Sequence, residues 1–61
     1  MHMTMKEKLL LELKVVQRLI ELTQEQIDKD EDAILDTLNR AYLRGYKYTE
    51  KVLTEILGEE K

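Results

Sequence analysis

The chain has 61 residues, of which 38% are charged, and its formal net charge is -3. It contains neither Cys nor Pro, which excludes disulfides and thiolate metal sites and favours uninterrupted helices. A chain of this length buries only about 60% of the surface that its unfolded form exposes, so we expect one small domain, residues 1–61, stabilised by self-association. The acidic balance argues against a general nucleic-acid binder. No run approaches the roughly 18 apolar residues of a membrane span, so we expect a cytoplasmic protein without a membrane partner.

The first predicted helix covers about residues 5–28. Thr4 and Glu7 form a capping-box pattern, in which the hydroxyl accepts from a backbone N–H of the first turn and the carboxylate reaches back to the capping residue. Apolar residues then recur with spacings of four and three, which is typical of one helix face packed along a seam. The members of this seam are Leu9, Leu13, Val16, Ile20, Thr23 and Ile27.

A turn at about residues 29–31 and a second helix at about 31–57 follow. The same rhythm returns at Ile34, Leu38, Ala41, Gly45, Tyr48 and Val52. Laid antiparallel, the two seams match position by position, which pairs Ile27 with Ile34, Val16 with Gly45 and Leu9 with Val52. The sequence therefore predicts an all-α fold, an antiparallel two-helix hairpin that dimerises into a four-helix bundle.

Gly45 leaves an alternative open, because a mid-helix Gly costs about 1 kcal/mol relative to Ala. The segment RGYKYTEKVLTEILG resembles the first part of a sigma-factor-like helix-turn-helix unit, which would end a helix at Gly45. Only three residues follow Gly58, so a recognition helix is missing. We favour a continuous second helix in which Ala41 and Gly45 allow the first helix to approach closely.

The stretch DKDEDAILD, residues 28–36, places five carboxylates within nine residues. Asp28, Asp30 and Asp32 have the spacing that opens a calcium-binding EF-hand loop, but Ala33 replaces its Gly and Asn39 its final Glu. We interpret the stretch as a turn, with Asp28 or Asp30 capping the second helix and Glu31 and Asp32 in its first turn. We expect no metal and no cofactor.

The hairpin layout and the turn DKDEDA resemble the Rop family of plasmid-encoded RNA-binding proteins. The resemblance implies a dimeric four-helix bundle built from two hairpins, and it offers RNA binding as an alternative function. It identifies no RNA-contacting residue in this chain, which also lacks Phe.

Further apolar residues lie outside the predicted seam on both helices. A lone hairpin cannot bury them together with the seam, so we expect an interface with a second copy or with a helix of another protein. The predicted interface residues are Val15, Leu19, Leu22, Leu35, Tyr42, Tyr46, Leu53 and Ile56, with Leu11 beside them.

Four basic residues of the second helix, Arg40, Arg44, Lys47 and Lys51, recur at spacings of four, three and four and form a basic line. Such a line could contact phosphates, and it is the site that an RNA-binding function would use. Asp36, Glu50 and Glu55 stand three or four residues from Arg40, Lys47 and Lys51, so helix-surface ion pairs explain the same pattern.

No constellation of catalytic residues is evident. The one His, His2, lies in an N-terminal stretch that resembles an expression remnant, and nucleophilic triads need such a base. We therefore expect a non-enzymatic regulatory or adaptor protein that acts through protein–protein contacts, with no catalytic residues.

Overall fold

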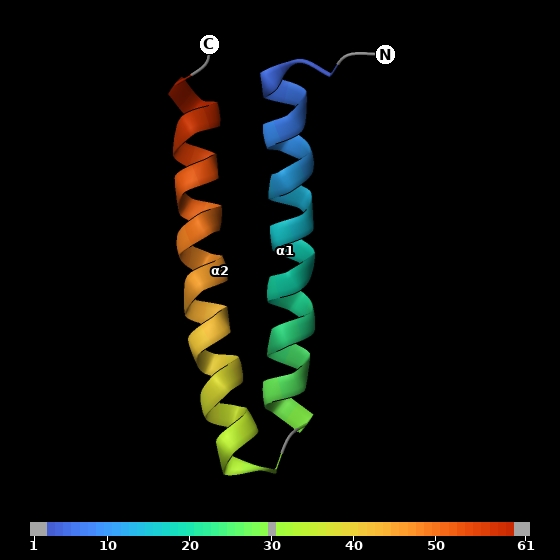
Figure 1. Cartoon of the computed structure of the whole chain (residues 1–61), viewed down its shortest axis with the longest axis vertical. Coiled ribbons are helices and arrows are strands. Elements are labelled where there is room, and N and C mark those ends of the chain that lie inside the picture. Colours follow the sequence, from blue (N-terminus) through green and yellow to red (C-terminus); the bar gives the residue numbers. More distant parts are fainter. Residues whose placement is uncertain (1–2, 30, 60–61) are drawn as a thin grey trace.

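The computed structural model describes residues 3–29 and 31–59, which form two α-helices and a short turn. Helix α1 covers Met5–Lys29 and helix α2 covers Ala33–Glu59. Figure 1 shows the two helices packed side by side with opposite chain directions, so the chain is all-helical and forms an antiparallel hairpin. The hairpin measures 43 × 24 × 13 Å. Neither helix, within the described ranges, is long and apolar enough to cross a membrane.

The capping box predicted at the start of α1 is present. The Thr4 hydroxyl accepts a hydrogen bond from the Glu7 backbone N–H at 3.1 Å, and the Glu7 carboxylate accepts one from the Thr4 N–H at 3.4 Å. These bonds satisfy two N–H groups that an isolated helix end would leave without partners. Helix α1 accordingly begins at Met5.

The cap of α2 is Asp32, so the prediction that Asp28 or Asp30 caps this helix was wrong for Asp28, while Asp30 lies outside the described residues. The Asp32 carboxylate accepts from the N–H groups of Ile34 and Leu35, at 2.9 and 3.3 Å. Its carbonyl accepts the first helical bond, from Asp36 N–H at 2.9 Å. Helix α2 therefore begins at Ala33, after Glu31 and Asp32, because Asp32 can bond the first-turn amides only from outside the helix.

The seam predicted on α1 faces α2. Val16 and Ile27, with 6% and 8% of their surface exposed, are the buried hydrophobic residues of the described chain. The other members, Leu9, Leu13, Ile20 and Thr23, are half-buried. The Thr23 hydroxyl donates to the Leu19 carbonyl at 2.7 Å, so this polar member of the seam has a hydrogen-bond partner inside α1. The core is consequently small, a single layer between two helices.

Helix α2 presents a different face to α1 from the predicted one. Its half-buried residues recur at spacings of three and four, and they are Asp36, Asn39, Leu43, Tyr46, Glu50, Leu53 and Leu57, with Val52 outside this rhythm. Of the predicted seam, Ile34, Leu38, Ala41, Gly45 and Tyr48 are exposed and Val52 is half-buried. Large side chains such as Leu43 and Leu53 fill the space between two helices better than Ala41 and Gly45 can, because a packed core leaves few voids.

Helix α2 is continuous through Gly45, as expected, and no Gly of the described residues has a positive φ. The helix-turn-helix interpretation, which required a break there, was therefore wrong. The prediction that α1 approaches Gly45 closely was also wrong, since a Cβ added at Gly45 would meet no atom within 4 Å. In the hairpin, Gly45 faces open space.

Candidate protein-binding face

The predicted seam of α2 forms an apolar line that is exposed except at the half-buried Val52. We call it the outer seam, and its members are Ile34, Leu38, Ala41, Gly45, Tyr48, Val52 and, one turn further, Ile56. Ile34 and Tyr48 have 73% and 69% of their surface exposed. At 100° per residue, the outer seam lies about 140° around α2 from the side that contacts α1. The sequence pattern therefore identified a real apolar line, although this line points away from α1.

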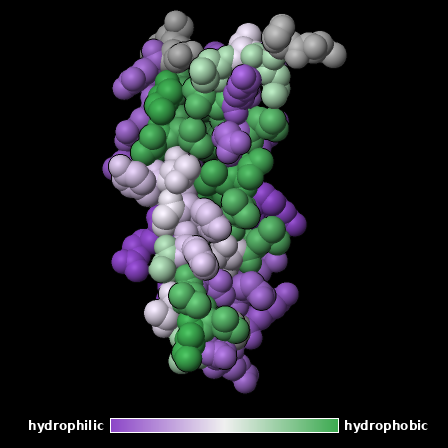
Figure 2. Space-filling model, in the orientation of Figure 1, coloured by the Kyte–Doolittle hydropathy of each residue, from purple (hydrophilic) through white to green (hydrophobic). Residues whose placement is uncertain are grey.

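Helix α1 carries a matching outer stripe, defined by Leu11, Val15 and Leu22, which are all exposed. This stripe lies about 140° around α1 from its contact side, at 100° per residue. Because the helices run in opposite directions, these two rotations bring the outer stripe and the outer seam to the same side of the hairpin. Figure 2 shows hydrophobic side chains along both helices on one face. The hairpin thus has one apolar face, made by both helices.

The predicted interface residues divide between this face and the helix–helix contact. Val15, Leu22, Leu35, Tyr42 and Ile56 are exposed, while Leu19, Tyr46 and Leu53 are half-buried. Tyr46 and Leu53 belong to the α2 side that packs on α1. The Tyr42 and Tyr46 rings stack with their centroids 6.4 Å apart, so they link the contact side of α2 to its apolar face. Sequence reasoning missed Ile34 and Leu38 as exposed residues, because it assigned them to the core.

The hairpin exposes more surface than its mass leads one to expect. Its accessible surface is 5198 Å². A folded monomer of 7.3 kDa exposes about 4,200 Å² on average. The excess of roughly 1,000 Å² is comparable to the about 800 Å² that each partner buries in a standard protein–protein interface.

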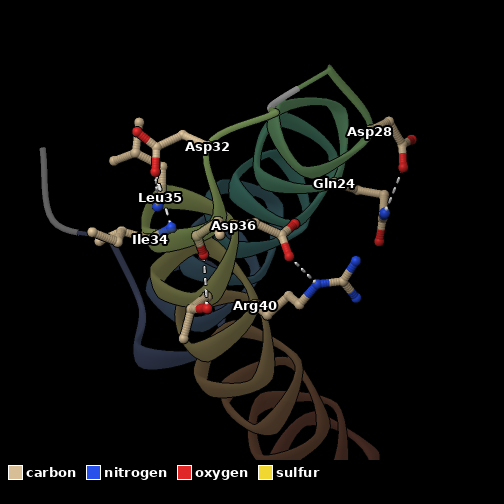
Figure 3. Close-up of polar contacts among 9 residues, drawn as sticks. Gln24, Asp28, Asp32, Ile34, Leu35, Asp36 and Arg40 are labelled. Atoms are coloured by element: carbon tan, nitrogen blue, oxygen red, sulfur yellow. Dashed lines mark hydrogen bonds and ion pairs between the residues drawn. The ribbon is translucent and has the colours of Figure 1, made fainter.

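The acidic stretch at the turn spreads its carboxylates rather than gathering them, as Figure 3 shows. Asp28 accepts from the Gln24 side-chain amide at 3.1 Å, and Asp36 pairs with Arg40 at 2.8 Å. Asp32 caps α2. Within residues 3–29 and 31–59, no group of three or more His, Cys, Asp or Glu side chains is placed to hold a metal ion.

The basic line forms fewer ion pairs with neighbouring carboxylates than the sequence suggested. Arg40 forms the predicted ion pair with Asp36. Lys47 and Lys51 form no ion pair with Glu50 or Glu55 in the described part of the chain, and all four basic residues are exposed. At 100° per residue the line lies about 115° around α2 from the outer seam, so the two surfaces are separate.

One hollow of about 270 Å³ lies at the first turns of α1. Its walls are Met3, which precedes α1, and Glu7, Leu10, Leu11 and Lys14 from the first turns of that helix. Ligand sites are normally concave pockets enclosed by several elements, so this hollow is a gap between surface side chains.

Comparison with protein-family models, with curated proteins and with solved structures gave no significant match. The apolar face and the basic line are therefore the surfaces from which a function can be inferred.

Proposed function

We propose that the protein is a small, non-enzymatic helical module that acts through protein–protein contacts, as a regulatory or adaptor protein, and that it associates with itself. A second hairpin covers the apolar face and completes a four-helix bundle. The observation that carries this proposal is the apolar face itself, made by the outer seam of α2 and the outer stripe of α1. Exposed apolar surface on this scale usually marks an interaction site.

The size of the core supports the same proposal. Val16 and Ile27, the buried side chains among residues 3–29 and 31–59, give the hairpin little hydrophobic stabilisation. Small domains that lack disulfides and metals commonly obtain the missing core by oligomerising. Covering the apolar face would convert Ile34 and Leu38 from exposed to core residues, which is the environment that the sequence pattern predicts for them.

The test is sedimentation equilibrium together with thermal unfolding at several protein concentrations. We expect a dimer, and a melting temperature that rises with concentration because association stabilises the folded state by mass action. Leu38→Lys should weaken the dimer, since it places a charge in the covered face. Thr54→Lys is the matched control, because it adds the same charge nine residues from Gly45 and thus on the opposite side of α2. A monomer at all concentrations would contradict self-association, and binding of a foreign amphipathic helix by that monomer would indicate an adaptor groove instead.

A second candidate function is RNA binding by the basic line, favoured by the exposure of Lys47 and Lys51 without ion-pair partners. Phosphate contacts weaken steeply with salt, so binding to a structured RNA hairpin should be measured at low ionic strength. Lys47→Glu should then reduce affinity, whereas Lys8→Glu on α1 makes the same charge change away from the line. Absence of binding at low salt would exclude this function.

A further inference from the structure

The outer seam of α2, taken with Tyr42 and Thr49 beside it, has residues of similar type at equal distances on both sides of Gly45. Counting three, four, seven and eleven residues either way gives matched pairs: Tyr42 and Tyr48, Ala41 and Thr49, Leu38 and Val52, Ile34 and Ile56. These offsets are the ones that return to the same face of an α-helix. A second α2 laid antiparallel across Gly45 would therefore meet tyrosine with tyrosine, small with small and aliphatic with aliphatic.

The outer stripe of α1 has its own centre at the same height on the hairpin. Leu11 and Leu22 are centred between residues 16 and 17, and Val15 is centred on residue 17 together with Leu19, a half-buried residue beside the stripe. The chain reverses between Lys29 and Ala33, so residues equally distant from position 31 lie at one level. Position 17 is fourteen residues before this point and Gly45 is fourteen after it. Both apolar lines are thus symmetric about a single level, which one two-fold axis can satisfy.

A second hairpin could cover the apolar face with its turn at the same end or at the opposite end, and the distribution of charge favours one of these arrangements. The turn end carries five carboxylates and one Lys in residues 28–36, and the open end balances Lys6, Lys8 and Lys51 against Glu7, Glu55 and Glu59. Turns at the same end would bring two acidic stretches together. Turns at opposite ends would separate them by about the 43 Å length of the hairpin, which is roughly four Debye lengths at 0.1 M salt. Each acidic turn then lies beside a neutral end.

From these observations we infer that a second copy of this chain covers the apolar face in an antiparallel arrangement, with the turns at opposite ends and a two-fold axis crossing the outer seam at Gly45. This inference rests on the proposed self-association and specifies its geometry. Ala41, Gly45 and Thr49 lie at the crossing point, where their small side chains let two α2 helices approach closely. A two-fold interface uses the same patch on both copies, so a self-complementary seam is the pattern that it requires.

The inference can be tested by spin-label distance measurements on single-Cys variants, since the chain has no Cys of its own. Lys29→Cys places a label at the turn end and Glu55→Cys places one near the open end, and both positions are exposed. Sedimentation equilibrium of each labelled variant establishes that it still dimerises. Lys29 lies twelve residues from the level of the two-fold axis and Glu55 lies ten, so at 1.5 Å per residue we expect distances of roughly 36 Å for the first variant alone and roughly 30 Å for the second. A mixture of the two variants should add a short distance, nearer to the 24 Å width.

The possible outcomes separate this inference from the proposed function. A dimer with a short distance between the two Lys29→Cys labels would overturn the antiparallel arrangement and leave self-association intact. A monomer in sedimentation would overturn both. A long distance for each variant alone, with the short distance appearing only on mixing, would establish the arrangement.

Discussion

Substituting Gly45 by Ala distinguishes the lone hairpin from the dimer, because the change should stabilise the lone hairpin but not the dimer. In the lone hairpin a Cβ at position 45 meets nothing within 4 Å, and the residue has helical dihedrals. The substitution then gains the full difference in helix propensity, about 1 kcal/mol. For a domain of this size, a gain of about 1 kcal/mol raises the melting temperature by about 4–8 °C.

In the antiparallel dimer the added methyl group lies where two α2 helices cross. Extra carbon atoms in a packed contact typically cost about 1–3 kcal/mol, which offsets or exceeds the gain in propensity. We therefore expect Gly45→Ala to stabilise the protein at low concentration and to become neutral or destabilising as the concentration rises. The melting curves of the two proteins should converge or cross.

The assay is thermal unfolding followed by circular dichroism, from the most dilute measurable sample to millimolar protein. Gly58→Ala is the matched control, because its Cβ also meets open space but it lies about 140° around α2 from Gly45, in the last turn. Its effect should be small and independent of concentration. A Gly45→Ala gain that stays the same at every concentration would refute the placement of Gly45 in the interface.

Three further substitutions test the hairpin itself by chemical denaturation. Asp32→Ala removes the cap of α2 and should lower the free energy of unfolding by about 1 kcal/mol. Asp28→Ala removes a carboxylate from the negative end of α1 and should leave the free energy of unfolding unchanged or raise it slightly. A larger loss for Asp28→Ala than for Asp32→Ala would mean that the cap is wrongly assigned. Ile27→Ala removes one of the two buried side chains and should cost about 2 kcal/mol, the low end of the range for such changes. A negligible cost for Ile27→Ala would show that the core between the helices is not formed.

Helix α1 could be predicted from the sequence in detail, because its pattern leaves little choice. The capping box fixes its start at Met5, and the seam from Leu9 to Ile27 is the side that packs on α2. Thr23 sits in this seam without an unsatisfied hydroxyl, since it bonds within its own helix. Regular spacing and a complete cap were sufficient here.

Helix α2 was harder to predict because its apolar surface covers more than one side. Two sets of residues with the same spacing overlap on it, one containing Ala41 and Gly45 and the other containing Leu43, Tyr46 and Leu53. Periodicity finds both sets but cannot say which one contacts α1. Side-chain volume would have favoured the second set. The cap of α2 was ambiguous for a related reason, as several carboxylates compete for one position and only the backbone path selects Asp32.

The buried residues are distributed unevenly along the hairpin, and this affects the resistance of a single, unassociated copy to proteolysis. Val16 lies at the middle of α1 and Ile27 near its turn end, while the first ten residues of α1 and the whole of α2 contain no buried side chain. Local opening is cheapest where few apolar contacts must break. Backbone amides at the open end should therefore exchange with deuterium first, and proteases should cleave there first. If a second copy covers the open end, proteases degrade an unassociated chain faster than a dimeric one. The rate of degradation then depends on the concentration of the chain itself.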